Sequence, residues 1–287
     1  MPTAPSSTRP ELHPWNHGFH WEPHTGPFQL LSDSQVAQFD RDGFVVLPDV
    51  LSPVDVALAV AEIDVAEASV EAFLRGVDGE RLSIAEAGAI TFAPHLVARS
   101  PRLRELATSP GLVGVCRDLI GPDVNLYWDQ AVYKKPEKPR RFPWHQDNGY
   151  TFVRPQEYLT CWVALTDATL GNGCPQVARG RHVHGTLRHH YVEPLGWECF
   201  EDPDDVAVAE VGAGGVVVFS SLTPHLTGPN TSDAVRKAYI LQYAPAGAVI
   251  LQGDPDGPDA PVEVPADAPD RQFPVLRDGR TTRTPAR

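Results

Sequence analysis

The chain has 287 residues, of which 42% are hydrophobic and 21% charged, and its formal net charge is −13. This composition is typical of a globular protein, and no apolar run approaches the roughly 20 residues needed to cross a bilayer. The negative charge argues against a nucleic-acid partner, because binding to phosphates requires clustered lysine and arginine. We therefore expect neither a nucleic acid nor a membrane as a partner.

The cysteines and the N-terminal residues indicate the compartment. The cysteines form no CxxC pair and are too sparse for a disulfide scaffold, so free thiols are expected. The first fifteen residues lack the charged start and apolar stretch of a secretory signal. We therefore expect a cytoplasmic protein. The four cysteines are Cys116, Cys161, Cys174 and Cys199.

Residues 1–31 are rich in proline, histidine and tryptophan and show no periodicity, which predicts an irregular N-terminal arm. Four histidines in it have the spacing of one helix face, which could bind a metal. Proline and glycine between them interrupt such a helix, so an arm packed on the domain surface is favoured. The four are His13, His17, His20 and His24.

The rest, 32–287, is predicted to be one domain, because barrels and sandwiches often form a single unit of roughly 200–250 residues. Its front, 32–121, is mostly helical. Serine caps, prolines in first turns and terminal glycines mark the helix ends, and an apolar run predicts one strand between the first two helices. The predicted helices are 32–42, 53–76, 101–108 and 110–120, with the strand at 44–47.

Residues 122–245 are predicted to form a β core, and 246–287 a loop-rich tail with one late strand at most. The core contains several segments rich in valine, tyrosine, tryptophan and threonine, without helices between them, which indicates an antiparallel sandwich or barrel. The fold class is therefore mainly β with flanking helices. The predicted core strands are 125–135, 158–166, 206–211, 215–220 and 237–243.

The segment Phe142–Tyr150 contains the sequence WHQD. On an extended backbone, His145 and Asp147 point the same way, so an imidazole and a carboxylate can meet at one point. Two histidines and one carboxylate on one face of a metal leave positions open for substrates, as in non-haem Fe(II) oxygenases. An HxD pair alone is a weak signal, and a third ligand must come from elsewhere.

His225 can supply that ligand, because it ends the segment SSLTPH (220–225), which directly follows the apolar strand Val216–Phe219. Beyond it, the turn-rich segment 228–233 predicts a hairpin that returns Arg236 to the neighbourhood of His225. A guanidinium there could hold a carboxylate through two parallel hydrogen bonds.

Four segments, in this order, resemble the phytanoyl-CoA dioxygenase family over residues 32–245: FDRDGFVVLPDVLS (39–52), WHQDNGY (144–150), TCWVALTDATLGNGCPQV (160–177) and PHLTGPNTSDAVRKAYILQY (224–243). Members are Fe(II)- and 2-oxoglutarate-dependent oxygenases with the double-stranded β-helix, or jelly-roll, fold. Where the family often has a Pro-Gly-Ser-His turn, which generally lies near the substrate, this chain has ARGRH (178–182). This difference weakens any inference of the substrate from the family.

The resemblance implies roles for individual residues. His145, Asp147 and His225 would bind the iron, and Arg236 would bind the distal carboxylate of 2-oxoglutarate. The other implied cosubstrate contacts are Thr227, Trp162, Gln130 and Lys134. The candidate substrate contacts are Trp144, Gln146, Tyr150 and His182.

The implied reaction uses O₂ and 2-oxoglutarate to hydroxylate a small metabolite, with release of succinate and CO₂; desaturation or cyclisation uses the same chemistry. Asp147 disfavours halogenation, since related halogenases have glycine or alanine at this position. Three alternatives are open. One is a non-catalytic jelly-roll protein that binds a metal or metabolite, which would lack a ligand or the arginine. Another is a cupin-like metalloenzyme without 2-oxoglutarate, which would carry more histidines in its first motif. The third is a structural sandwich with an accidental HxD.

Overall fold

The computed structural model describes residues 11–137 and 142–282. The predicted arm therefore lies in part outside the described residues, since 1–10 are not among them, and so do residues 283–287 of the predicted tail.

The helices begin and end at the residues that the sequence indicates. The Ser32 hydroxyl accepts a hydrogen bond from the backbone N–H of Gln35, and the Gln35 side chain accepts one from the backbone N–H of Ser32. Gly43 ends the helix with φ +83°. Ser52 and Asp55 form the same capping box ahead of the second helix, which has proline in its first turn. The α-helices are α1 (Asp33–Asp42), α2 (Pro53–Arg75), α3 (Pro101–Leu106) and α4 (Pro110–Leu119), and the short 3₁₀ helices are Asp78–Glu80, Leu96–Ala98, Asp147–Gly149, Leu170–Asn172 and Arg181–His184.

A long antiparallel sheet runs through the molecule, with the strands in the order β1-β12-β7-β14-β5-β4-β3-β2 and with β17 on the other end of β5. Its longest strands, β5 and β14, pair along most of their lengths. The strands are β1 (Phe44–Leu47), β2 (Arg81–Leu82), β3 (Ala85–Glu86), β4 (Ile90–Pro94), β5 (Val124–Lys134), β7 (Leu159–Ala164), β12 (Val216–Ser220), β14 (Arg236–Pro245), β17 (Pro274–Arg277) and β18 (Arg280–Thr281).

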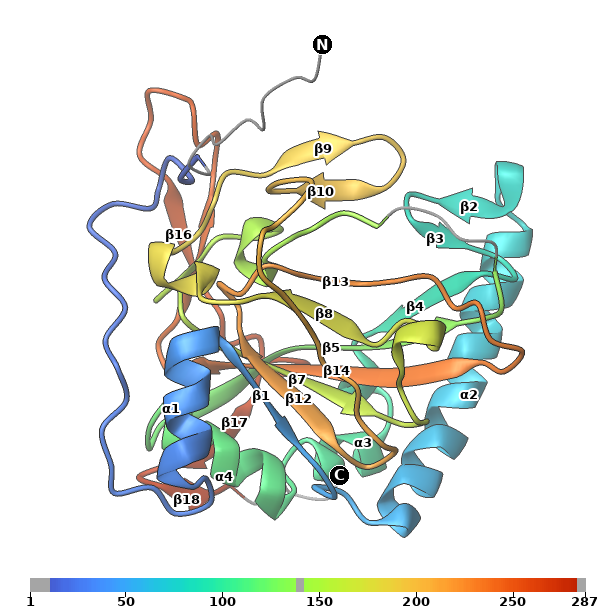
Figure 1. Cartoon of the computed structure of the whole chain (residues 1–287), viewed down its shortest axis with the longest axis horizontal. Coiled ribbons are helices and arrows are strands. Elements are labelled where there is room, and N and C mark those ends of the chain that lie inside the picture. Colours follow the sequence, from blue (N-terminus) through green and yellow to red (C-terminus); the bar gives the residue numbers. More distant parts are fainter. Residues whose placement is uncertain (1–10, 138–141, 283–287) are drawn as a thin grey trace.

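Three smaller sheets complete the β structure. The sheet β11-β8-β13 faces the long sheet, and the two enclose the interior of the jelly roll (Figure 1). The hairpin β9–β10 lies at the opposite end of the molecule from α3 and α4. These strands are β8 (Pro175–Ala178), β11 (Val206–Val208) and β13 (His225–Thr227); β9 (His190–Val192) and β10 (Gly196–Glu198); and β6 (Val153–Arg154), β15 (Val249–Gln252) and β16 (Val262–Pro265).

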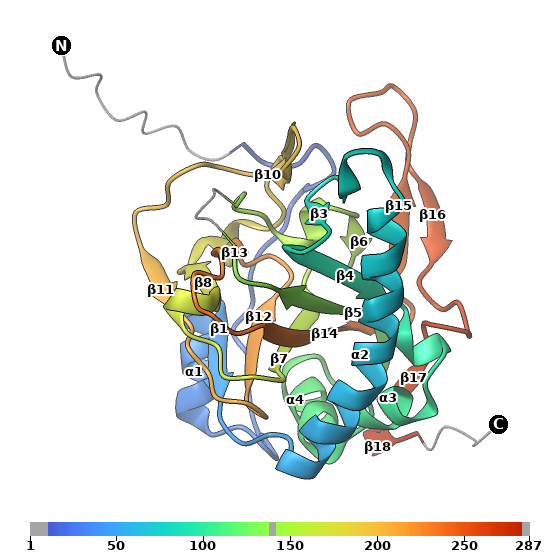
Figure 2. The same cartoon turned by 90° about the vertical axis from the view of Figure 1, so that its right-hand side faces the viewer.

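Alternate residues of the long sheet belong to two different cores, because successive side chains of a strand point to opposite faces. On β7, Cys161 and Val163 pack with the helices, whereas Trp162 and Ala164 face the interior of the jelly roll. Helices α2, α3 and α4 cover the outer face (Figure 2). The predicted fold class, mainly β with flanking helices, is confirmed.

Two parts of the chain contain more β structure than the sequence predicts. In the predicted helical front, β4 pairs with β5, and in the predicted loop-rich tail β15–β18 form two antiparallel pairs. These strands are short and several of their residues are exposed, so they lack an apolar alternation that a sequence could show. They form because an edge strand offers unpaired backbone groups.

The described part of the arm packs as an irregular segment, as expected. His24 hydrogen-bonds to Asp40 and to the carbonyl of Leu119, while His13 packs 4.8 Å from the Phe152 ring, measured between ring centroids. Among the described residues, these histidines are not part of a metal-binding group.

All four cysteines are free thiols, as expected. Within the ranges that the structure describes, no helix is both long and apolar enough to cross a membrane.

Candidate metal centre

The HxD segment lies directly beside β13, the strand that begins with the third predicted ligand, His225. The backbone N–H of His145 donates to the carbonyl of His225 at 3.0 Å, and the N–H of His225 donates back at 2.9 Å. This reciprocal pair is an isolated antiparallel bridge. It holds the two imidazoles side by side, with ring centroids 4.4 Å apart.

The three predicted metal ligands converge. One ligand atom from each of His145, Asp147 and His225 lies within 4.8 Å of the others, and among the described residues this is the group that could hold a metal. His225 Nε2 is 3.8 Å from Asp147 Oδ1. Two imidazole nitrogens and one carboxylate oxygen are the donor set of a non-haem Fe(II) site with open positions.

Backbone carbonyls fix the tautomers of both histidines. His145 Nδ1 lies 3.2 Å from the carbonyl of Pro143, and His225 Nδ1 lies 3.0 Å from that of Thr223. A carbonyl can only accept, so each Nδ1 carries the proton and each Nε2 keeps its lone pair for a metal. Burial, together with the neighbouring His225, holds the pKa of His145 well below its usual range, so this imidazole is neutral at physiological pH, as a ligand must be.

A hydroxyl that the sequence did not single out orients the carboxylate. Thr160 on β7 donates to Asp147 Oδ2, and Gln242 Nε2 lies 3.4 Å from the same hydroxyl. Oδ1 is left facing His225. A carboxylate held in this way presents one defined oxygen to a metal. Thr160 precedes Trp162 by two residues and shares its strand face, which is the signal that could have identified it.

Gln146 is predicted to contact substrate, but its side-chain amide hydrogen-bonds to the protein backbone instead. Its side chain donates to the carbonyls of Gly185 and Leu222 and accepts from the N–H of Leu187. The physical reason is strand alternation, which points Gln146 away from the face shared by its two neighbours.

His189 hydrogen-bonds to the backbone of the same segment. Its Nε2 accepts a hydrogen bond of 2.9 Å from the N–H of Gln146, and its Nδ1 donates to the carbonyl of Leu187. Burial lowers the pKa of His189 to about 4, which keeps it a neutral acceptor. A Cβ on Gly149 would lie 2.0 Å from this ring, so the glycine allows the imidazole to approach the HxD turn.

Arg236 is a buried cation with unused donors. Its side chain is 1% exposed, Nη1 donates to the carbonyl of Val132 at 3.4 Å, and Nε and Nη2 have no hydrogen-bond partner among the described residues. The guanidinium carbon lies 5.0 Å from the centroid of the Trp162 ring. Burial lowers the pKa of Arg236 to about 9. An unsatisfied buried guanidinium is costly, and a carboxylate binding to Nε and Nη2 would satisfy it, so the site fits 2-oxoglutarate.

The other predicted cosubstrate contacts lie on the same inner face. Thr227 is two residues beyond His225 on β13. Lys134 Nζ donates to the carbonyl of Thr227 at 2.6 Å and lies over the Phe142 ring, so it ties β5 to β13. Gln130 lies on the same face of β5 and is half-buried.

The remaining candidate substrate contacts lie in different places. Tyr150 is 48% exposed, and its ring meets that of His145 edge-on at 5.2 Å. Trp144 is buried and its ring lies 6.1 Å from that of Phe200. His182 is fully buried beneath Trp21, with Nε2 3.1 Å from the carbonyl of Asp40. The structure thus places His182 in the packing of α1 and the arm.

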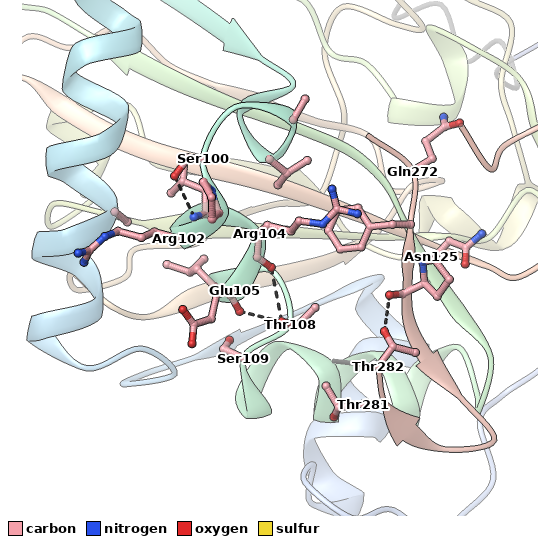
Figure 3. A pocket seen from close by; sticks show the side chains of 18 of the residues that line it. Ser100, Arg102, Arg104, Glu105, Thr108, Ser109, Asn125, Gln272, Thr281 and Thr282 are labelled. Carbon is pink, nitrogen blue, oxygen red and sulfur yellow. Dashed lines mark hydrogen bonds between the residues drawn. The ribbon is translucent and has the colours of Figure 1, made fainter. Parts of the chain in front are cut away.

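A large cavity of about 1570 Å³ lies on the helical side of the long sheet, between α2, α3 and β17 (Figure 3). Arg104, Asn125 and Gln272 line it. Neither the three candidate ligands nor Arg236 is among the described residues around it, so it is separate from the metal centre.

Comparison with known proteins identifies the family. The model of the phytanoyl-CoA dioxygenase family matches residues 39–238. An ectoine dioxygenase of Bordetella parapertussis is 30% identical over 237 residues, which is 74% of this chain and 75% of that protein. A probable phytanoyl-CoA dioxygenase of Caenorhabditis elegans is 33% identical over 162 residues, or 51% and 52% of the two chains. A solved non-haem α-ketoglutarate-dependent carbocyclase from nogalamycin biosynthesis shares the fold, with a TM-score of 0.65, 24% identity, and coverage of 88% of this chain and all of that one. The chain therefore belongs to the phytanoyl-CoA dioxygenase family.

Proposed function

We propose that this protein hydroxylates a small metabolite at the centre formed by His145, Asp147 and His225. As a member of its family it is an Fe(II)- and 2-oxoglutarate-dependent dioxygenase. The observation that carries the proposal is a compact group of two histidines and one carboxylate together with a buried arginine whose Nε and Nη2 have no hydrogen-bond partner in the part of the chain that the structure describes. The first fits iron and the second fits the cosubstrate.

Each residue has a defined task in this proposal. His145 Nε2, His225 Nε2 and Asp147 Oδ1 would hold Fe(II), while Thr160 keeps the second carboxylate oxygen occupied. Arg236 would bind the distal carboxylate of 2-oxoglutarate beside Trp162 and Thr227. When iron and cosubstrate are bound, O₂ reduction coupled to oxidative decarboxylation of 2-oxoglutarate supplies the oxidant for the substrate. The protein orients the reactants and keeps them together.

The substrate is proposed to be a small molecule. The relatives include an ectoine dioxygenase and a methylphosphonate hydroxylase, and both names denote small polar metabolites. The net charge of −13 disfavours a polyanionic partner such as a nucleic acid. Both candidate features, the ligand group and the arginine, are retained here, which argues against the non-catalytic alternative. Arg236 has a role only if a carboxylate binds, which argues against a cupin-like enzyme without 2-oxoglutarate.

Anaerobic titration of the Fe(II)-loaded protein with 2-oxoglutarate tests this assignment. We expect the charge-transfer absorption of the chelated cosubstrate at about 500 nm. In Arg236→Ala and Arg236→Lys, half-saturation should require at least about ten-fold more 2-oxoglutarate, because truncating one partner of a buried charge pair costs about 2 kcal/mol or more. Arg102→Ala, on the exposed face of α3, is the matched control and should bind as the wild type does. Absence of the band in folded, iron-loaded wild type would refute the 2-oxoglutarate assignment, and unchanged half-saturation in both Arg236 variants would refute the role of Arg236.

A further inference from the structure

We infer that the N-terminal arm positions the turn that carries Asp147. Asn16, in the arm, acts on this turn through three buried side chains that hydrogen-bond in series. These are Gln156, Thr186 and Asn148, and together with Asn16 they are called the arm network below. The inference rests on the proposed metal centre and adds to it a positioning residue from a distant part of the chain.

The described start of the arm lies beside the segment that leads into β9 (Figure 1). Leu12 and Leu187 form an isolated antiparallel bridge, and the N–H of His13 donates to the carbonyl of Thr186 at 2.9 Å. Leu187 donates its own N–H to the side chain of Gln146. The segment before β9 therefore lies between the arm and the HxD segment and hydrogen-bonds to both.

The links of the arm network are hydrogen bonds between buried side chains. Asn16 Oδ1 accepts from Gln156 Nε2 at 3.0 Å. Gln156 Oε1 accepts from the hydroxyl of Thr186 at 2.7 Å and from its backbone N–H at 2.9 Å. The same hydroxyl accepts from Asn148 Nδ2 at 2.6 Å. All four residues are between 0% and 8% exposed, so bulk water has little access to these bonds.

The direction of each bond is fixed from both ends of the network. Asn16 Nδ2 donates to two backbone carbonyls of the segment before β9. Carbonyls can only accept, so the Asn16 oxygen is left for Gln156. At the other end, the N–H of Val153 can only donate, and it donates to Asn148 Oδ1, so the amide nitrogen of Asn148 is left for Thr186. Both ends require the same direction for the bonds between them, so no member can be reversed alone.

Asn148 connects the network to the candidate metal ligand. It directly follows Asp147 in the 3₁₀ helix Asp147–Gly149. The arm network holds its side chain, and its backbone N–H donates to the carbonyl of Ser221 at 3.2 Å. Thr160 limits the rotation of the carboxylate, whereas Asn148 holds the backbone from which the carboxylate projects. Groups that orient a ligand from outside affect metal affinity although they do not touch the metal.

A glycine allows the arm to come this close. Gly185 has φ +75°, and a Cβ there would lie 2.7 Å from Asn16 Nδ2 and 2.9 Å from a ring carbon of Phe19. The arm histidines His17 and His20, by contrast, are exposed. The arm therefore reaches the turn of the metal centre through a buried asparagine and not through its histidines.

Anaerobic competition of Fe(II) between the full chain and a chromogenic chelator tests the inference. Thr186→Val should weaken Fe(II) binding at least about ten-fold, because valine has a similar shape but cannot connect Asn148 to Gln156. Thr186→Ser keeps the hydroxyl and should bind nearly as wild type does. Asn16→Leu should also weaken binding at least about ten-fold. His24→Ala is the matched control, because it removes the arm's hydrogen bond to α1 and leaves the network intact, so it should bind Fe(II) as wild type does.

Two further readouts separate positioning from a general loss of stability. The visible d–d absorption of the Co(II)-loaded protein depends on ligand geometry. It should change in Asn16→Leu and remain unchanged in His24→Ala, while thermal unfolding of the metal-free proteins measures the stability that each variant loses. In the Thr186→Val background, Asn16→Leu should have no further effect on Fe(II) affinity, because the series of bonds is already broken.

Three results would overturn the inference: wild-type Fe(II) affinity in folded Asn16→Leu, a Thr186→Ser variant as weak as Thr186→Val, or additive effects in the double variant. If Asn16→Leu does not fold, the comparison of the two Thr186 variants decides. If wild type binds no Fe(II), the proposed metal centre fails and the inference fails with it. If wild type binds Fe(II) and shows the 2-oxoglutarate band, but the Asn16 and Thr186 variants bind Fe(II) equally well, only the inference fails.

Discussion

The hydroxyl of Thr160 should control how tightly the centre binds Fe(II). Thr160 donates to Asp147 Oδ2, and it is 1% exposed, so water cannot replace it freely. In Thr160→Val the carboxylate loses this bond and can rotate, so that Oδ1 no longer has a fixed direction. A hydrogen bond to a charged group contributes about 1.5–3 kcal/mol, and loss of a bond that orients a ligand lowers metal affinity roughly 10- to 100-fold.

Anaerobic competition of Fe(II) between the protein and a chromogenic chelator measures this effect. Thr160→Ser keeps the hydroxyl and should bind Fe(II) nearly as wild type does, whereas Thr160→Val should bind 10- to 100-fold more weakly, by the same reasoning. Thermal unfolding of the metal-free proteins checks that the valine variant is folded. Wild-type affinity in Thr160→Val would refute the argument, and so would a serine variant as weak as the valine variant.

Two further predictions concern buried histidines. Gly149→Ala places a Cβ 2.0 Å from the His189 ring, so it should lower the free energy of unfolding by about 1–3 kcal/mol and weaken Fe(II) binding. Gly171→Ala is the control, because a Cβ there meets only the Thr169 hydroxyl at 3.9 Å. Equal effects of the two substitutions in urea unfolding would contradict this reasoning. Burial lowers the pKa of His182 from 6.5 to about 4. The unfolded chain therefore takes up this proton at higher pH than the native state, so the stability due to the neutral histidine is complete above pH 6.5 and is lost as the pH falls to about 4. Over that pH window, protonation of His182 should lower the free energy of unfolding of the wild type by about 3 kcal/mol. The free energy of unfolding of His182→Gln should fall by correspondingly less, and parallel pH profiles of the two proteins would contradict the assignment.

The sequence predicts those features that are encoded locally. Ser32 with Gln35 marks a helix start within four residues, and the spacing of His145 and Asp147 places both on one face of an extended segment. His225 is recognisable because it comes soon after an apolar strand, although the structure places it at the start of the next strand, β13, and not at the end of β12. In each case the physical cause lies within a few neighbouring residues, and the structure brings the three side chains together.

Features that depend on distant partners are not predictable in this way. Thr160 acts on a carboxylate 13 residues away, and His189 accepts from a backbone N–H 43 residues away. Threonine in a strand and histidine in a loop are both common for unrelated reasons, so neither stands out in the sequence. The strands β4 and β15 likewise form because a neighbouring edge is available.

Backbone hydrogen bonds connect the candidate metal ligands with Arg236. The bridge between His145 and His225 fixes the register of β13 against the HxD segment. Lys134 donates to the carbonyl of Thr227 at the end of β13, and Lys134 is also the register partner of Arg236 on β14. A shift of β13 by one residue would turn His225 away from Asp147 and break the contact to Lys134 together. Backbone pairing therefore sets the distance between the candidate metal ligands and Arg236, and it keeps β5, β13 and β14 in register around the candidate site.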